Sequence, residues 1–225
     1  MIDEPIKEMY PSVTTFTKWV HEFAPGLPNM ITKQPDPMMQ GVDIWCPLTP
    51  SLDLPELETH LEQGGTLWTY VCSGPGRPHA NFFLHQPGMT NRIPLWLAYK
   101  YGAEGFLYWE HAWWYGRDPW TDQSFQGMPD TWGDGLLVYP GPDGPINSIR
   151  FEIVREGIQD VEYFLFLEDL VSKLPQDSPK RKQAEQLLII GDDLIRSPKD
   201  WNPDAKAFLN RKAEVARQIE LLLQD

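Results

Sequence analysis

Short apolar segments that alternate with helical segments constrain the fold of this chain more than any other feature. Five segments have the near-continuous apolar character of buried strands, and they centre near residues 2, 31, 44, 69 and 107. The clearest is Thr-Leu-Trp-Thr-Tyr-Val-Cys at 66–72, which is rich in β-branched and aromatic residues. Helical segments and short links separate these strands, so the pattern predicts an α/β fold with parallel strands covered by helices.

Periodicity and cap residues predict the helices. The first carries apolar residues at helical spacing: Val13, Phe16, Val20 and Phe23. Two shorter helices are expected at 55–62 and 91–101, and a short extra strand at 135–139 before a turn at 140–145. A long amphipathic helix begins after Asn147 or Ser148, either of which is a suitable N-cap. Its apolar stripe is Ile153, Val154, Ile158, Val161, Leu165 and Leu170.

Two further helices are expected after Ser178-Pro179 and Asn202-Pro203, where a cap residue precedes proline. We therefore divide the chain into an α/β domain at 1–175 and a C-terminal helical pair at 176–225 that packs on it.

Composition and charge narrow the class of ligand. With 225 residues and 41% hydrophobic residues, the chain can bury a sizeable core. Ten Trp and eight Tyr suit a cleft in which sugar rings stack on aromatic side chains, although a large core explains them slightly better. A formal charge of -13 argues against nucleic acid and anionic membranes as partners.

Other compositional features predict no metal, cofactor or membrane segment. Cys46 and Cys72 form neither a disulfide framework nor a zinc motif, and we expect buried thiols. His111 follows a strand end without a second ligand at suitable spacing, so no metal site is predicted. The chain as given shows neither a leader nor an apolar run long enough to span a bilayer, and on this ground we expect a soluble, cytoplasmic protein.

Acidic and aromatic residues gather where the predicted strands end. Asp3 and Glu4 follow the first strand, and Pro5 prevents a helix from starting through them. In parallel α/β proteins the reactive groups lie at the carboxyl ends of strands, where Tyr70 and Trp109 are also found. Two such acids suit general acid catalysis and charge stabilisation, whereas the alternative is a pair of solvated charges near a chain end.

The loop at 110–131 contains Trp113, Trp114, Tyr115 and Trp120. Long ordered loops of this kind are often functional.

Several motifs in order give the chain a family resemblance. They are Asp3-Glu4-Pro5, Trp68-Thr-Tyr70, Arg92 with Trp96, Gly105-Phe-Leu-Tyr-Trp109, Gly133-Asp-Gly135 before Tyr139-Pro140, and Arg150-Phe-Glu152 followed by Arg155-Glu-Gly157-Ile-Gln-Asp160. Together they resemble the catalytic domain of glycoside hydrolase family 123, the retaining β-N-acetylgalactosaminidases. The resemblance covers residues 2–163.

The resemblance implies a (β/α)8 barrel of which this chain holds strands four to eight. The first three strands and the family's preceding β-sandwich domain are missing from it. An uncovered parallel edge exposes backbone groups and apolar side chains, so we expect self-association through the open barrel edge.

The resemblance also implies a substrate-assisted mechanism. Glu4 would be the general acid and base, and Asp3 would hold the substrate's acetamido N–H. Tyr70 is the candidate for the acetamido oxygen, with a core tyrosine as the alternative. Trp109 and Trp113 are candidates for sugar stacking, or else packing residues. Asn81 is a candidate for the sugar hydroxyls.

Arg92 is another candidate for the sugar hydroxyls, although an ion pair at a helix end suits it better. We assign Arg150, Glu152, Arg155, Asp160 and Glu162 to the outer, polar face of the long helix. Two other functions remain open at this point: an inactive carbohydrate-binding domain and a plain scaffold.

Overall fold

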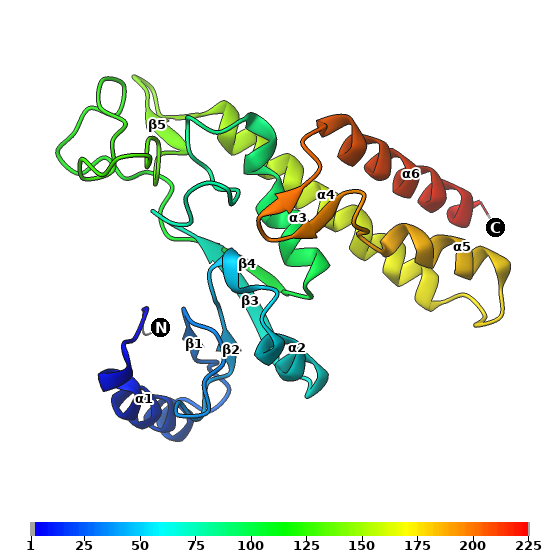
Figure 1. Cartoon of the computed structure of the whole chain (residues 1–225), viewed down its shortest axis with the longest axis horizontal. Coiled ribbons are helices and arrows are strands. Elements are labelled where there is room, and N and C mark those ends of the chain that lie inside the picture. Colours follow the sequence, from blue (N-terminus) through cyan, green and yellow to red (C-terminus); the bar gives the residue numbers. More distant parts are fainter. Residues whose placement is uncertain (1–2, 225) are drawn as a thin grey trace.

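A parallel sheet of four strands forms the centre of the computed structural model, which describes residues 3–224 (Figure 1). The strands β1 (Met30–Ile31), β2 (Ile44–Trp45), β3 (Thr66–Val71) and β4 (Gly105–Tyr108) lie side by side in sequence order. Four of the predicted strands and the α/β class are therefore confirmed. The strand expected near residue 2 falls outside the described residues.

The predicted helices are present, with one corrected boundary. They are α1 (Tyr10–Phe23), α2 (Pro55–Glu62), α3 (Ile93–Lys100), α4 (Ile149–Ser172), α5 (Pro179–Leu188) and α6 (Ala205–Leu223). Ser148 is the N-cap of α4, because its hydroxyl accepts a hydrogen bond from the Phe151 N–H at 3.1 Å. The cap predicted at Asn202 for α6 is wrong, since Asp204 caps that helix by accepting from the Lys206 N–H at 3.0 Å.

Two antiparallel hairpins complete the secondary structure of the described residues, together with three short 3-10 helices at Lys7–Met9, Thr49–Ser51 and Gly88–Asn91. β5 (Val138–Pro140) pairs with β6 (Pro145–Asn147), which confirms the extra strand and the turn. β7 (Ile195–Ser197) pairs with β8 (Asp200–Trp201) between α5 and α6 and was not predicted. Its strands are too short and too polar to show a period of two.

The main apolar core lies between the sheet and the helices, and it continues without a break into α5 and α6. Trp96 of α3 meets Phe164 of α4 and Phe208 of α6 edge-on, each with ring centroids 5.0 Å apart. Figure 1 shows α4, α5 and α6 stacked at one end of the molecule and α1 at the other. The division at residue 175 stays a prediction.

The buried faces of α1 and α4 differ from the predicted stripes. In α1, Phe16 and Phe23 are exposed while Tyr10, Val13 and Thr17 are buried. In α4, Ile158 and Leu165 are exposed while Phe164 and Leu167 are buried.

The inward face of α4 also contains the fully buried carboxylate of Asp160 and the buried guanidinium of Arg150. Our assignment of these two residues to an outer polar face is therefore wrong. Asp160 points inward because it pairs with Arg92, and Arg150 because it donates to the carbonyls of distant loop residues; an apolar period cannot reveal such long-range contacts.

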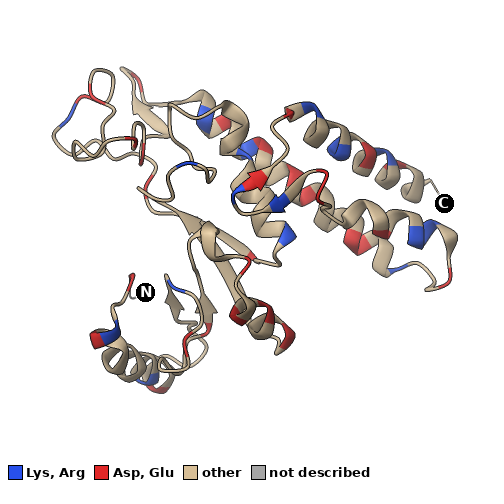
Figure 2. Cartoon of the chain, in the orientation of Figure 1, with Lys and Arg blue, Asp and Glu red and all other residues tan. Residues whose placement is uncertain are grey.

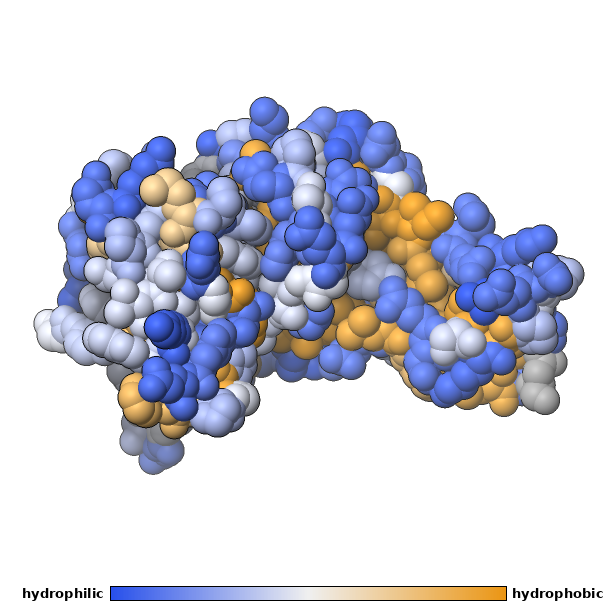
Figure 3. Space-filling model, turned by 90° about the horizontal axis from the view of Figure 1, so that it is seen from below, coloured by the Kyte–Doolittle hydropathy of each residue, from blue (hydrophilic) through white to orange (hydrophobic). Residues whose placement is uncertain are grey.

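Charge and apolar surface are distributed unevenly. Figure 2 shows that both acidic and basic residues lie on the group of helices α4, α5 and α6. Figure 3 shows apolar side chains at the surface of one face. The predicted self-association stays untested. None of the described helices is both long and apolar enough to cross a membrane.

Candidate active site

The segment that carries Asp3 and Glu4 is fixed to the end of β1. The Thr32 hydroxyl donates to Asp3 Oδ1 at 2.7 Å and accepts from the Glu4 N–H at 2.7 Å. Lys33 Nζ donates to the Pro5 carbonyl at 2.9 Å. Glu4 has φ +39°, a conformation uncommon outside glycine that needs such support. Although both acids are exposed, each has a defined hydrogen-bond partner.

Tyr70 joins this acid pair from the carboxyl end of β3. Its hydroxyl donates to Glu4 Oε1 at 2.5 Å, and its side chain is otherwise buried. Burial raises the pKa of Tyr70, and the hydrogen bond and charge of Glu4 raise it further. The phenol therefore remains a neutral donor at physiological pH.

A cavity of about 330 Å³ opens above these residues. Asp3, Glu4, Thr32, Tyr70, Trp109 and Phe125 contribute to its lining. It lies at the carboxyl ends of β1, β3 and β4, as parallel α/β folds favour. Cys72 also lines it, and burial raises the pKa of that thiol, with a smaller contribution from the charge of Glu4. The structure thus brings Asp3, Glu4, Tyr70 and Trp109 together.

Asp134 supports Trp109, which forms one wall of the cavity. Asp134 was not selected as a site residue from the sequence. Its Oδ1 accepts from Trp109 Nε1 at 3.0 Å and from the Tyr108 hydroxyl at 3.1 Å. The Tyr108 hydroxyl in turn accepts from the Gly135 N–H at 2.7 Å. Asp134 is fully buried, and burial raises its pKa although the hydrogen bonds from Trp109 and Tyr108 oppose this. The Gly133-Asp-Gly135 motif was the available signal.

Gly135 and Trp113 complete the support of this wall. Gly135 has φ +68°, and a Cβ there would lie 2.9 Å from atoms of both Trp109 and Trp113. The Trp113 ring lies 5.0 Å from that of Trp109, centroid to centroid. Trp113 packs beside Trp109 but does not line the cavity. Only glycine allows the chain to pass so close to the two indoles.

Asn81 lies away from the cavity. It is fully buried, and its side-chain amide donates to the carbonyls of Cys72 and Pro75, both at 3.0 Å. Its Oδ1 accepts from the Phe82 N–H at 2.7 Å. Both amide hydrogens therefore serve the loop after β3, and we do not retain Asn81 as a sugar ligand.

Arg92 forms the ion pair that we considered the better alternative. Its Nη2 donates to Asp160 Oδ1 at 2.6 Å, and its Nε donates to Asp160 Oδ2. Trp96 Nε1 at 2.8 Å and Lys212 Nζ at 3.0 Å complete the shell of that carboxylate. The Asp160 cluster, as we call these four residues, is buried among helices and has no free acceptor directed at a cavity.

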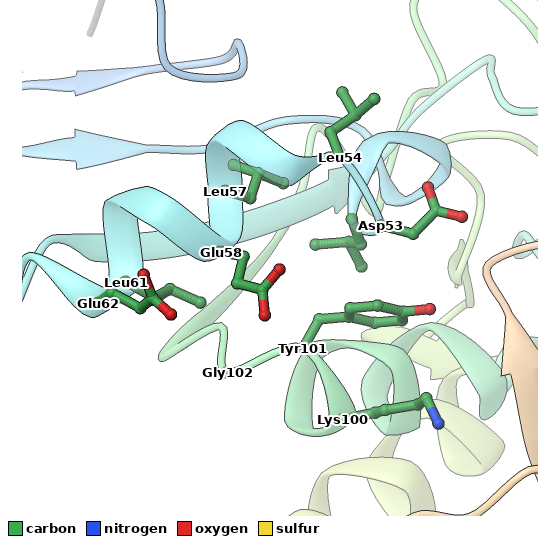
Figure 4. Close-up of a pocket in the computed structure, with 10 residues that line it drawn as sticks. Asp53, Leu54, Leu57, Glu58, Leu61, Glu62, Lys100, Tyr101 and Gly102 are labelled. Atoms are coloured by element: carbon green, nitrogen blue, oxygen red, sulfur yellow. The ribbon is translucent and has the colours of Figure 1, made fainter.

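A larger cavity of about 500 Å³ lies between α2 and α3 (Figure 4). Its floor is apolar, with Leu57 of α2 and Tyr101 after α3, and Asp53, Glu58 and Glu62 lie around it. Leu61 and Gly102 place it beside the segments that precede β3 and β4, at the amino ends of the strands. Active sites of parallel α/β enzymes lie at the carboxyl ends of the strands, so this cavity is at the opposite end of the sheet from the expected site.

Comparison with models of protein families shows the enzyme class to which the chain belongs. The model of the glycoside hydrolase 123 catalytic domain matches residues 1–167. The chain belongs to glycoside hydrolase family 123. The match includes every residue that lines the strand-end cavity and leaves out α5 and α6. Family 123 membership makes the chain a glycoside hydrolase by class. No curated protein matches the sequence.

Proposed function

We propose that this family 123 chain hydrolyses terminal β-linked N-acetylgalactosamine with retention of configuration, through assistance by the substrate's own acetamido group. One observation carries the proposal. A hydrogen-bonded series Asp3, Thr32, Glu4, Tyr70 lies in a cavity with Trp109 as a wall. Hydrolysis of such a sugar requires one acid for proton transfer, a second acid to orient the acetamido group, and an aromatic surface on which the sugar ring stacks.

The two acids have separate roles. Asp3 accepts a hydrogen bond from the acetamido N–H, which turns the acetamido oxygen toward the anomeric carbon. That oxygen forms the new bond to C1 as the glycosidic bond breaks, and the product is an oxazolinium ion. Glu4 donates its proton to the leaving oxygen and then removes a proton from the water that opens the oxazolinium ring. No enzyme nucleophile is needed.

Tyr70 links substrate binding to the state of Glu4. Its hydroxyl contacts Glu4 in the free chain. We infer that it turns to the acetamido oxygen when the sugar binds. Glu4 then loses its hydrogen bond to Tyr70 and can turn toward the leaving oxygen. Trp109 stacks against the sugar face, with Trp113 as its support.

We also propose that the sheet corresponds to part of a (β/α)8 barrel, with the acid pair at the end of its fourth strand. The parallel order β1-β2-β3-β4 agrees with consecutive barrel strands. In this arrangement β1 to β4 are strands five to eight, and β4 is the edge for self-association.

Hydrolysis of an aryl β-N-acetylgalactosaminide tests the proposal. We expect turnover by the chain and a loss of about 100-fold to 10,000-fold in kcat for Glu4→Gln. Glu8→Gln, which changes an exposed acid in the short helix Lys7–Met9, is the matched control. Sugar binding without turnover by the unaltered chain would instead indicate an inactive carbohydrate-binding domain. Neither binding nor turnover would indicate a scaffold.

A further inference from the structure

Aromatic rings continue from the cavity wall to the surface of the loop at 110–134. Trp113 lies next to Trp109, and Tyr115 lies next to Trp113 with ring centroids 4.3 Å apart. Phe125, which lines the cavity, is 5.1 Å from Trp109 and 5.9 Å from Trp113. Tyr115 is 70% exposed. We call Trp113 and Tyr115 the outer pair.

Two other tryptophans of this loop, Trp114 and Trp120, have a structural use that the outer pair lacks. Trp114 Nε1 donates to the Val138 carbonyl at 3.0 Å, and Trp120 Nε1 donates to the Pro140 carbonyl at 2.9 Å. Both therefore anchor the loop to β5. Among the described residues, neither Trp113 Nε1 nor the Tyr115 hydroxyl has a hydrogen-bond partner, and neither is a buried unpaired atom.

The backbone around the outer pair is held in place. The Trp113 N–H donates to the Gly135 carbonyl at 2.8 Å, and a bridge joins Ala112 to Leu136. Arg117 Nη2 donates to the Trp113 carbonyl at 3.2 Å, and the Arg117 N–H donates to the Trp114 carbonyl at 2.7 Å. Because the backbone that carries the rings is already fixed, ligand binding costs less conformational entropy than it would on a free loop.

We propose that the outer pair is a subsite for the second sugar ring of the substrate, the one that leaves. The proposal rests on the function proposed above, in which the first ring occupies the cavity at Glu4. A pyranose has an apolar face that packs on an aromatic ring and hydroxyl groups at its edge. The free Trp113 N–H and Tyr115 O–H are suited to those hydroxyls. The preferred substrate is therefore an oligosaccharide rather than a simple glycoside.

Binding in a non-hydrolysing background tests this subsite apart from catalysis. In Glu4→Gln, calorimetry compares methyl β-N-acetylgalactosaminide with disaccharides in which β-N-acetylgalactosamine is linked 1→3 or 1→4 to galactose. We expect at least one disaccharide to bind about tenfold more tightly than the methyl glycoside. Adding Tyr115→Ala should reduce this advantage to about twofold or less, and Tyr115→Phe should leave an intermediate value.

Trp132→Ala is the matched control, because Trp132 is an exposed tryptophan of the same loop with no ring contact to the outer pair. It should keep the disaccharide advantage. Equal binding of both sugar types, no binding of either, or an advantage that survives Tyr115→Ala overturns the subsite. Failure of the hydrolysis assay with the unaltered chain overturns the proposed function instead, so the two failures are distinguishable.

Discussion

Asp160 and the Asp3–Glu4 pair are acids in two regions of the molecule, and they differ in their partners. Asp160 is fully buried in the helical region and contacts Arg92, Lys212 and the Trp96 N–H. Asp3 and Glu4 lie at the strand ends and contact the hydroxyls of Thr32 and Tyr70. Among the described residues, no Lys, Arg or His forms an ion pair with either.

This difference separates an acid that stabilises the fold from acids that are free to react. The Asp160 carboxylate is buried with partners on both oxygens, and this geometry leaves no room for a substrate. A carboxylate held by a neutral hydroxyl at a cavity can exchange that hydroxyl for a group of the substrate. Asp160 and the Asp3–Glu4 pair all have hydrogen-bond partners, so the type of partner distinguishes them.

Asp160→Ala should give the largest loss of stability. It leaves Arg92 and Lys212 without their shared counter-charge between α3, α4 and α6, and we expect the free energy of unfolding to fall by about 3–5 kcal/mol. Urea unfolding measures the change. Asp169→Ala is the matched control on the same helix, because the Asp169–Lys173 pair is exposed. That variant should change stability by about 0.5 kcal/mol or less.

If Asp160→Ala and Asp169→Ala both lowered the free energy of unfolding by the same small amount, Asp160 would not be an acid that stabilises the fold. The helices would then hold together through the apolar contacts of Trp96, Phe164 and Phe208 alone.

Gly135→Ala should weaken the Trp109 wall and lower stability by about 1–3 kcal/mol. An alanine at this position must adopt an unfavourable positive φ, and its Cβ meets the ring of Trp109 and the Cβ of Trp113. Gly127→Ala separates these causes, because Gly127 has φ +70° but open space around its Cβ position. The loss beyond that of Gly127→Ala measures the contact, and only Gly135→Ala should raise KM for the aryl glycoside. Equal losses of stability in Gly135→Ala and Gly127→Ala would show that Trp109 and Trp113 move away from the new Cβ at no cost.

Local signals in the sequence predicted much of the fold. Pro55 at the first position of α2 and Ser148 at the cap of α4 lie beside the elements they delimit, and these boundaries agree with the structure. The inward face of α4 depends on a pair between Arg92 and Asp160, 68 residues apart, and no periodicity reveals it. The hairpin of β7 and β8 was missed because its strands are short and polar.

The candidate site was predictable to the extent that it follows the strand ends. Tyr70 and Trp109 lie at the ends of β3 and β4, Asp3 and Glu4 follow a strand that was only predicted, and the structure brings all four residues to one cavity. Thr32 also ends a strand, yet a single hydroxyl shows no pattern that distinguishes it from a surface threonine. Asn81 was chosen for its chemistry alone, and its buried place in the loop after β3 explains why that was insufficient.

Thr32→Val should affect catalysis more than stability. It removes the hydroxyl that joins the Asp3 carboxylate to the Glu4 backbone and keeps the shape of the side chain. We expect kcat for the aryl glycoside to fall about tenfold, because the two acids lose their mutual alignment. Thr32→Ser retains the hydroxyl and should keep most of the activity. If Thr32→Val and Thr32→Ser both had the kcat of the unaltered chain, catalysis would not depend on the Thr32 hydroxyl. The neutral partners of Asp3 and Glu4 would then not explain their role in the site.

Asp134→Asn gives the smallest effect and shows which of the two acid types Asp134 resembles. Asn keeps an acceptor for Trp109 and Tyr108 but does not titrate. The pKa of Asp134 is raised in the folded chain, because burial outweighs its hydrogen bonds and the charge of Arg150. The folded state thus binds this proton more tightly than the unfolded state, and ionisation of Asp134 destabilises the fold as pH rises. In urea titrations, the stability of Asp134→Asn relative to the unaltered chain should therefore increase as pH rises through the ordinary titration range of an aspartate, and it should level off above the raised pKa of Asp134. Carboxylates common to both proteins cancel in this difference. A relative stability that instead decreases with pH would mean that Arg150 dominates, and Asp134 would then belong with Asp160 among the acids held by cations.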